Sequence, residues 1–135
     1  MTRDNRQKAL TKEIAKARLA LASAEFSLNG HFSDTAANRA YYCVFHAARA
    51  ALLTIGVQPK THKGVNERFN LDLVIPQKIE SDYLSILGRE QTRRETADYS
   101  VDEEIGEQEA ELLVSEARRF LVRIEELIRS SGWTI

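Results

Sequence analysis

Hydrophobic residues recur at spacings of three and four along residues 4–28, the first long pattern in the chain. This period is that of one face of an α-helix, and it predicts an amphipathic helix of about six turns. The helix is expected to end at Gly30, because glycine readily adopts the left-handed conformation of a helix cap. The apolar face consists of Leu10, Ile14, Ala17, Leu21, Ala24 and Leu28. The charged residues expected on the other faces are Lys8, Lys12, Glu13, Lys16 and Glu25.

A second helix is predicted over residues 33–55, with Ser33 or Asp34 as its N-cap and Gly56 at its end. Its apolar positions are dominated by alanine, at Ala36, Ala37, Ala40, Ala47, Ala48, Ala50 and Ala51. Side chains this small let a neighbouring helix approach closely. We therefore expect this helix to be buried and a homodimer to form through its small residues.

Three further helices are predicted in the second half of the chain. A short one covers residues 61–70 and is followed by a loop. Pro76 suits the first position of the next helix, which continues to about residue 94. Residues 97–99 are expected to form a bend, and the capping box at residues 100–103 begins a long last helix.

Four long helices and one short helix, joined by brief connections, predict an all-α protein with an up-and-down bundle architecture. No strand alternation and no internal repeat is visible. A chain of 135 residues is expected to form one domain over residues 1–135, large enough to close a hydrophobic core.

Composition narrows the class of protein. No apolar run is long enough to span a membrane, and the single Cys43 lies in an apolar helix, so we expect a cytoplasmic protein. The net charge of −1 argues against a large non-specific nucleic-acid surface, although a local or dimer-generated basic cleft is compatible with it. The three histidines and one cysteine follow no ligand spacing, so neither a metal site nor a cofactor is predicted.

The second helix carries a row of polar residues at helical spacing. Arg39 and His46 are seven residues apart, which places them within about 20° of one azimuth on a helix. Tyr42 lies between them, and Arg49 extends the row by one turn. Because an unpaired buried guanidinium is costly, such a row marks a paired network, an oligomer seam or a polar cleft. In the structural alternative, Arg39 pairs with a carboxylate inside the bundle, His46 bonds to a tyrosine or the backbone, and Tyr42 is a core or seam aromatic.

Two other groups of residues are candidates for binding. His62 and Lys63 begin the short helix, where free backbone amides can meet a phosphate, although a histidine in such a place is more often a surface or capping residue. The densest basic cluster contains Arg89, Arg93 and Arg94, with acidic residues beside them, and is either a solvated face or an edge that binds RNA or a partner.

Asp98 and Tyr99 follow the basic cluster. They are expected to pair with Arg94 or Arg39 and so to hold the bend against the second helix.

These segments resemble the HEPN family of small helical bundles, specifically its small prokaryotic single-domain branch. The resemblance rests on residues 38–42 and 45–48 in the second helix, 61–64 in the following loop and 94–99 before the last helix. It implies a dimeric bundle of four to five helices that often pairs with a minimal nucleotidyltransferase in toxin–antitoxin modules. In many members, arginine–histidine motifs face each other across the dimer and cleave RNA without a metal.

The family's ribonuclease signature is an arginine followed by a histidine after four to six residues, and Arg39 and His46 match it with six residues between. In the best-known ribonuclease members the motif lies at a late helix, where this chain has Asp98 in place of a histidine. The resemblance therefore implies a toxin-type, metal-independent endoribonuclease that uses Arg39 and His46. The alternative is a non-catalytic HEPN module that pairs with a nucleotidyltransferase or binds RNA.

Overall fold

The computed structural model describes residues 1–99 and 104–135, apart from the side chains of residues 97 and 99. All the regular secondary structure in these described residues is helical, which confirms the predicted all-α bundle. The α-helices are α1 (Arg3–Asn29), α2 (Ser33–Leu53), α3 (His62–Phe69), α4 (Ser81–Tyr99) and α5 (Glu107–Ser130), and a π-helix, η1 (Asn70–Val74), follows α3. None of these helices is long and apolar enough to cross a membrane.

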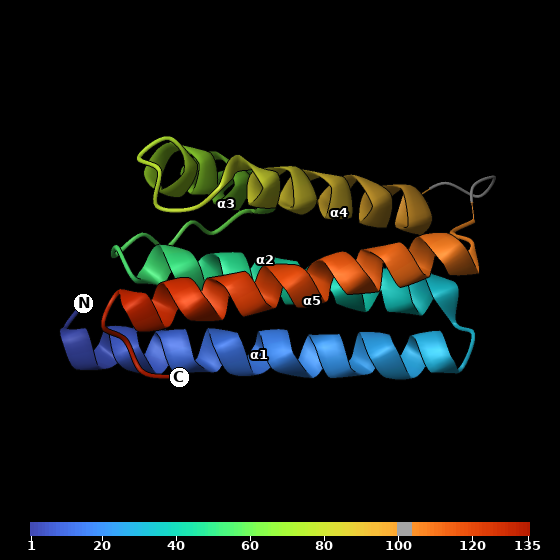
Figure 1. Ribbon diagram of the computed structural model, residues 1–135, viewed down its shortest axis with the longest axis horizontal. Coiled ribbons are helices and arrows are strands. Elements are labelled where there is room, and N and C mark those ends of the chain that lie inside the picture. The colour runs from blue at the N-terminus through green and yellow to red at the C-terminus, as the bar shows by residue number, and fades with distance from the viewer. Residues whose placement is uncertain (100–103) are drawn as a thin grey trace.

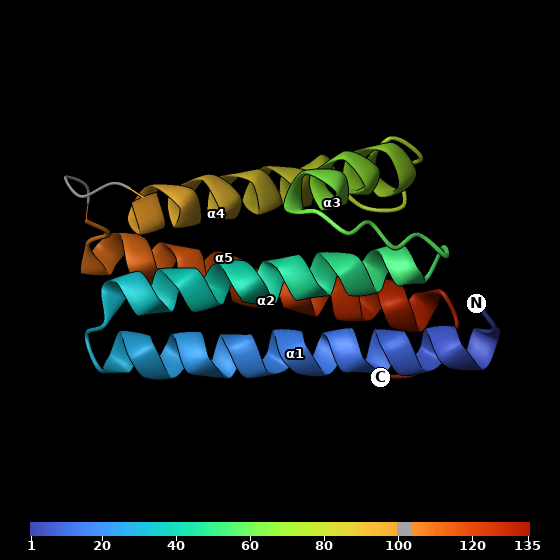
Figure 2. The same cartoon turned by 180° about the vertical axis from the view of Figure 1, so that it is seen from behind.

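The helices form three layers (Figure 1). The long helix α1 forms one layer, α2 and α5 lie together in the middle, and α3 and α4 cover the other side. The view from behind shows α1 and α2 running side by side along nearly their whole length (Figure 2). The middle layer is therefore covered on both sides, and α2 contacts every other α-helix.

The first helix has the predicted apolar face, since Leu10, Ile14 and Ala17 are all buried. Thr2 caps it by accepting a hydrogen bond of 3.1 Å from the Asn5 amide. Its end differs from the expectation. The left-handed residue is His31, with φ of 64°, whereas Gly30 has φ of −84°.

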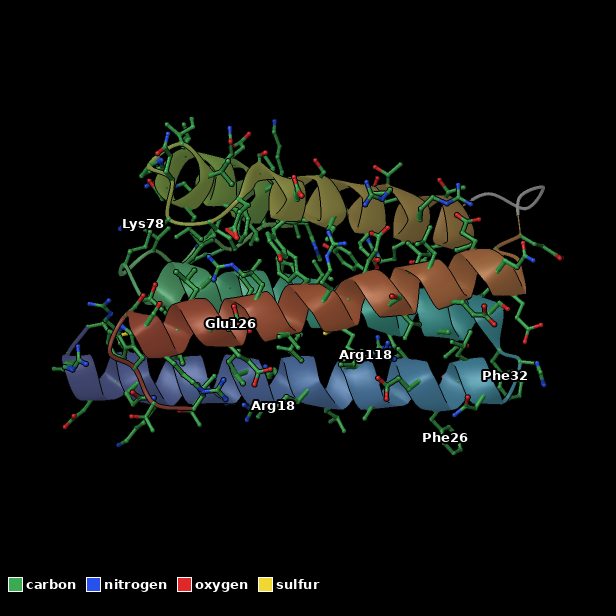
Figure 3. The ribbon with its side chains drawn as sticks, in the orientation of Figure 1. Arg18, Phe26, Phe32, Lys78, Arg118 and Glu126 are labelled. Carbon is green, nitrogen blue, oxygen red and sulfur yellow. The ribbon has the colours of Figure 1, made fainter. Side chains whose placement is uncertain are left out.

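The outer boundary between α1 and α5 carries ion pairs. Figure 3 shows Arg18 of α1 and Arg118 of α5 beside the opposite helix. Arg18 lies 2.6 Å from Glu125, and Arg118 lies 2.9 Å from Glu25. Pairs this exposed contribute about 0–1 kcal/mol each, so they position the two helices more than they stabilise them.

The alanines of α2 are taken up inside the chain, against α1 and α5, and are at most 2% exposed. This explains how three helices approach so closely at the centre of the fold. It also means that the alanine side of α2 is not available to a second copy of the chain. Any contact along α2 between two copies would have to use its polar side.

The connection between α3 and α4 was predicted wrongly. Instead of a loop, Asn70–Val74 forms a π-helix that follows α3 without a break. Leu73 of this π-helix is buried, as is Phe69 at the end of α3. Pro76 does not begin the next helix, because Gln77 adopts φ of 62° and the Lys78 amide bonds back to the Leu73 carbonyl at 2.8 Å. This turn delays the start of α4 until Ser81.

The expected bend at residues 97–99 is also wrong, because α4 continues through Tyr99. Pairs one turn apart support this extension: Arg94 lies 3.4 Å from Asp98, and Gln91 bonds to Glu95 at 3.2 Å. The last helix starts at Glu107, later than predicted. The capping box at residues 100–103 lies outside the described residues.

A carboxyl group is buried between α4 and the middle layer. Glu90 is 1% exposed, and neither of its carboxyl oxygens has a hydrogen-bond partner among the described residues. Burial and the charge of Glu116 raise the pKa of Glu90 from 4.5 to about 9, against the opposing effect of Arg89. The folded protein therefore holds Glu90 protonated at neutral pH.

We expect Glu90→Gln to stabilise the fold at neutral pH. Glu90 must be protonated when the chain folds. The free energy of unfolding is therefore unaffected by this requirement below pH 4.5, and it decreases as the pH rises towards about 9. The substitution removes this loss, by up to about 3 kcal/mol at pH 7. Denaturant unfolding of both proteins across this pH range measures the difference, which should grow with pH. The exposed Glu111→Gln on α5 is the control, and a gain at Glu90 that is independent of pH would contradict the explanation.

Candidate functional site

The predicted polar row opens into a groove between α1 and α2. The groove has a volume of about 560 Å³. Its lining residues are Lys16, Leu19, Ala20 and Ser23 from α1 and Arg39, Tyr42 and His46 from α2. Three of the predicted site residues are thus brought together on the side of α2 that the alanines leave free.

The imidazole of His46 is held by a carboxylate from the neighbouring helix. Glu13 Oε2 lies 2.8 Å from His46 Nδ1, and the other oxygen of Glu13 lies 3.7 Å from the Arg49 guanidinium. Glu13 is 9% exposed, so this carboxylate faces the bundle and not another face of α1 as expected. Among the described residues, His46 forms no hydrogen bond with a tyrosine or with the backbone.

Glu13 is ionised in this setting. Burial acts to raise its pKa, but the hydrogen bond with His46 and the charges of Arg49 and His46 outweigh burial, and the pKa is lowered. An ionised carboxylate only accepts hydrogen bonds, so His46 donates its Nδ1–H to Glu13. In the neutral imidazole, Nε2 then carries the lone pair that can accept a proton.

Arg39 lines the groove, and none of the described carboxylates neutralises its charge. Its Nε and Nη2 donate to Asn38 Oδ1 at 3.0 and 2.7 Å, and its guanidinium lies 4.8 Å from the centre of the Tyr42 ring. No carboxylate of the described residues forms an ion pair with it. The neutral Asn38 and the Tyr42 ring orient the guanidinium without neutralising it, so the charge is available to an anion.

A second cluster adjoins the groove through Tyr42. Arg94 of α4 donates to the Tyr42 hydroxyl at 3.4 Å, and its guanidinium lies 5.2 Å from the Tyr41 ring and 5.8 Å from the Tyr42 ring. Asp98 lies 3.4 Å from Arg94, one turn further along α4. Asp98 therefore pairs with Arg94 rather than Arg39. The side chain of Tyr99 lies outside the described part of the chain.

His62 joins this cluster, whereas Lys63 does not. The Tyr41 hydroxyl and His62 Nδ1 form a hydrogen bond, and the His62 ring stacks on Phe45 with centroids 4.4 Å apart. Lys63 is 85% exposed and lies 3.9 Å from Glu67, as a surface pair does. The cap of α3 is Thr61, which accepts from the amide two residues after His62, so His62 is not a capping residue.

The other two arginines of the predicted basic cluster, Arg93 and Arg89, bond to carboxylates of α5. Arg93 donates to Glu109 of α5 at 2.9 Å, and its neighbour one turn earlier, Arg89, donates to Glu116 at 3.1 Å. These bonds join α4 to α5 on the side away from Tyr42. In the part of the chain that the structure describes, no three histidine, cysteine, aspartate or glutamate side chains are grouped to hold a metal ion.

Comparison with known proteins places this arrangement in a family. The HEPN domain model matches residues 11–127. The chain belongs to the HEPN family. Two proteins of Methanocaldococcus jannaschii, each named a "putative toxin", are similar to it. One is 32% identical over 126 residues, covering 93% of this chain and 86% of the relative. The other is 39% identical over 117 residues, covering 87% and 85%. A protein of Pyrococcus horikoshii named UPF0332 is 44% identical over 59 residues, 44% of this chain and 41% of the relative.

The arginine–histidine spacing of this HEPN domain lies wholly within α2, and both side chains line one groove. In α4, where the resemblance leads one to expect the histidine, Asp98 pairs with Arg94. Sequence reasoning missed Glu13. The position of Glu13 in the sequence could have identified it. Glu13 lies three residues after Leu10 and four before Ala17, on the buried apolar face, where a charged residue needs a partner.

We expect Glu13→Gln to destabilise this HEPN domain by about 1–3 kcal/mol at pH 7, because His46 and Arg49 lose an ionised partner. A carboxyl group with a lowered pKa stabilises the fold above its unfolded value of 4.5, and this contribution is lost as the pH falls through the folded value. Denaturant unfolding at pH 7 and about pH 3 tests both statements, since the difference should vanish in acid.

The matched control for this substitution is Glu25→Gln, which removes an exposed carboxylate from the same helix. Its effect should stay below about 1 kcal/mol. Equal effects of the two substitutions at pH 7 would show that Glu13 is no more than a surface ion pair.

Proposed function

We propose that this HEPN domain is a toxin-type endoribonuclease that cleaves RNA without a metal ion. The observation that carries the proposal is the groove that holds Arg39 and His46 together, with His46 Nδ1 on the Glu13 carboxylate. The carboxylate leaves Nε2 as the proton acceptor, and Arg39 supplies a cation that no described carboxylate pairs with. Cleavage of RNA by its own 2′-hydroxyl needs a general base and a cation on the phosphate, and these two residues supply them.

In the proposed reaction, His46 Nε2 takes the proton of a ribose 2′-hydroxyl. The 2′ oxygen attacks the adjacent phosphorus, and the bond to the 5′ oxygen of the next nucleotide breaks. Arg39 stabilises the charge that develops on the phosphate oxygens, for which its planar guanidinium is suited. The products are a 2′,3′-cyclic phosphate and a 5′-hydroxyl end.

The leaving 5′ oxygen needs a proton, and we propose that a second copy of the chain supplies it in a homodimer. The alanines of α2 are buried within one chain, so the two copies would meet along the polar side that carries Arg39 and His46. We place the protein in the cytoplasm, where RNA is present and the single buried Cys43 stays reduced. The names of the two archaeal relatives support a role as a toxin.

The alternative function is a non-catalytic HEPN module that pairs with a minimal nucleotidyltransferase or binds RNA. One observation favours it. Asp98 pairs with Arg94 in the late helix, at the place where the resemblance leads one to expect a histidine. Cleavage by the purified protein separates the two functions.

We expect the purified protein to cleave RNA in the presence of EDTA. His46→Ala should lower the rate by a factor of about 10²–10⁴, because the general base is lost. Arg39→Ala should lower it by about 10²–10³, because charge on the phosphate is no longer stabilised. Gel analysis of labelled RNA measures the rates, and the chemistry of the new ends should be cyclic phosphate and 5′-hydroxyl.

The control is His31→Asn, which removes an exposed imidazole at the far end of α1 and tolerates the positive φ of that residue. It should cleave like the wild type. Folded, dimeric protein that leaves several RNAs intact would contradict the nuclease, and a stable complex with a minimal nucleotidyltransferase would then support the alternative.

A further inference from the structure

A second histidine lies beside the groove and is not part of the arginine–histidine spacing. The rings of His46 and His62 both pack against Phe45, with centroids 5.4 and 4.4 Å from it. His62 comes from α3, so a different element delivers it to the same aromatic side chain. Both rings are partly exposed, and each has its Nδ1 engaged by a neighbouring side chain.

The hydrogen bond with Tyr41 fixes where His62 carries its proton. Tyr41 is 1% exposed, and the only hydrogen-bond partner of its hydroxyl among the described residues is His62 Nδ1. Burial raises the pKa of Tyr41, so the hydroxyl keeps its proton. A buried O–H needs an acceptor, so Tyr41 donates to Nδ1. The neutral His62 ring then carries its own proton on Nε2.

The two neutral histidines therefore carry their ring proton on different nitrogens. Glu13 accepts from Nδ1–H of His46, which leaves a lone pair on Nε2, whereas Tyr41 donates to Nδ1 of His62, which leaves an N–H on Nε2. One ring can accept a proton from a ligand, and the other can only donate a hydrogen bond while it is neutral.

The surroundings of His62 keep its ring neutral. Burial and the guanidinium of Arg94 lower the pKa of His62, against the opposing charge of Glu95, and Arg49 adds to the lowering. Arg94 and Arg49 are already paired with Asp98 and Glu13, so the group that these surroundings leave for a ligand is the ring N–H of His62. A phosphate oxygen can accept a hydrogen bond from this N–H, whereas a cationic or purely apolar ligand cannot.

We propose that His62 donates its Nε2–H to a phosphate oxygen of bound RNA, next to the phosphate on which His46 acts. Tyr41 is then a positioning residue that holds the His62 ring in the donating form. The inference rests on the RNA binding that the proposed function requires, and it assigns a phosphate contact to a residue outside the arginine–histidine signature.

The first test reads the proton positions directly and needs no RNA. Two-dimensional NMR that correlates ring nitrogens with ring protons distinguishes an imidazole protonated on Nδ1 from one protonated on Nε2. At pH values where both rings are neutral, we expect the proton on Nε2 in His62 and on Nδ1 in His46. Tyr41→Phe should remove this preference in His62 alone. A His62 ring protonated on Nδ1 in the wild type would overturn the proposal.

The second test measures binding of a 2′-deoxy-substituted RNA, which lacks the attacking hydroxyl and is not cleaved. His62→Ala should weaken its affinity by about tenfold or more, the effect of losing one hydrogen bond to a charged group. His62→Gln places an amide N–H near the position of Nε2–H and should stay within about threefold of the wild type. His31→Asn is the control and should bind unchanged.

The variants separate this inference from the nuclease. Equal losses in His62→Ala and His62→Gln would assign His62 a purely structural role, and unchanged binding in His62→Ala would remove it from the RNA path; either result overturns the inference alone. A wild type that binds through His62 but does not cleave would keep the inference and reject the nuclease. A wild type that binds no RNA would reject both.

Discussion

The close packing of α2 between α1 and α5 is the constraint on which the rest of the structure depends. Its alanines contribute little apolar area each, so the helix is stabilised only by contact on several sides at once. That leaves a single strip of α2 for larger polar side chains. Arg39, Tyr42 and His46 lie on this strip and line the groove between α2 and α1.

The same closeness explains why Glu13 is part of the site. A carboxylate on the inner side of α1, this near to α2, cannot turn out to water and would be costly if unpaired. The α2 residues that face it are His46 and Arg49, and both bind it. The contacts with His46 and Arg49 thus compensate for the burial of the Glu13 carboxylate, and they also fix the tautomer of His46.

Hydrophobic period alone predicted α1, α2 and α5 well, because each has a long apolar face that the core requires. It failed between Phe69 and Ser81, where the backbone follows a π-helix and a turn at Gln77 instead of a loop and a proline-initiated helix. Those conformations bury Leu73 and include one positive φ, and both features depend on tertiary structure. A periodic pattern does not contain them.

For the site, the spacing of seven placed Arg39 and His46 on one side of one helix, which is a local property that the sequence carries. The partners of the two histidines were not predictable in this way. Glu13 and Tyr41 reach their histidines from other helices or across a loop, so the contacts depend on how the helices are packed. A sequence presents His46 and His62 as alike. Only the fold gives one a carboxylate and the other a phenol, and the opposite roles that we propose for them towards an RNA phosphate rest on that difference in partner.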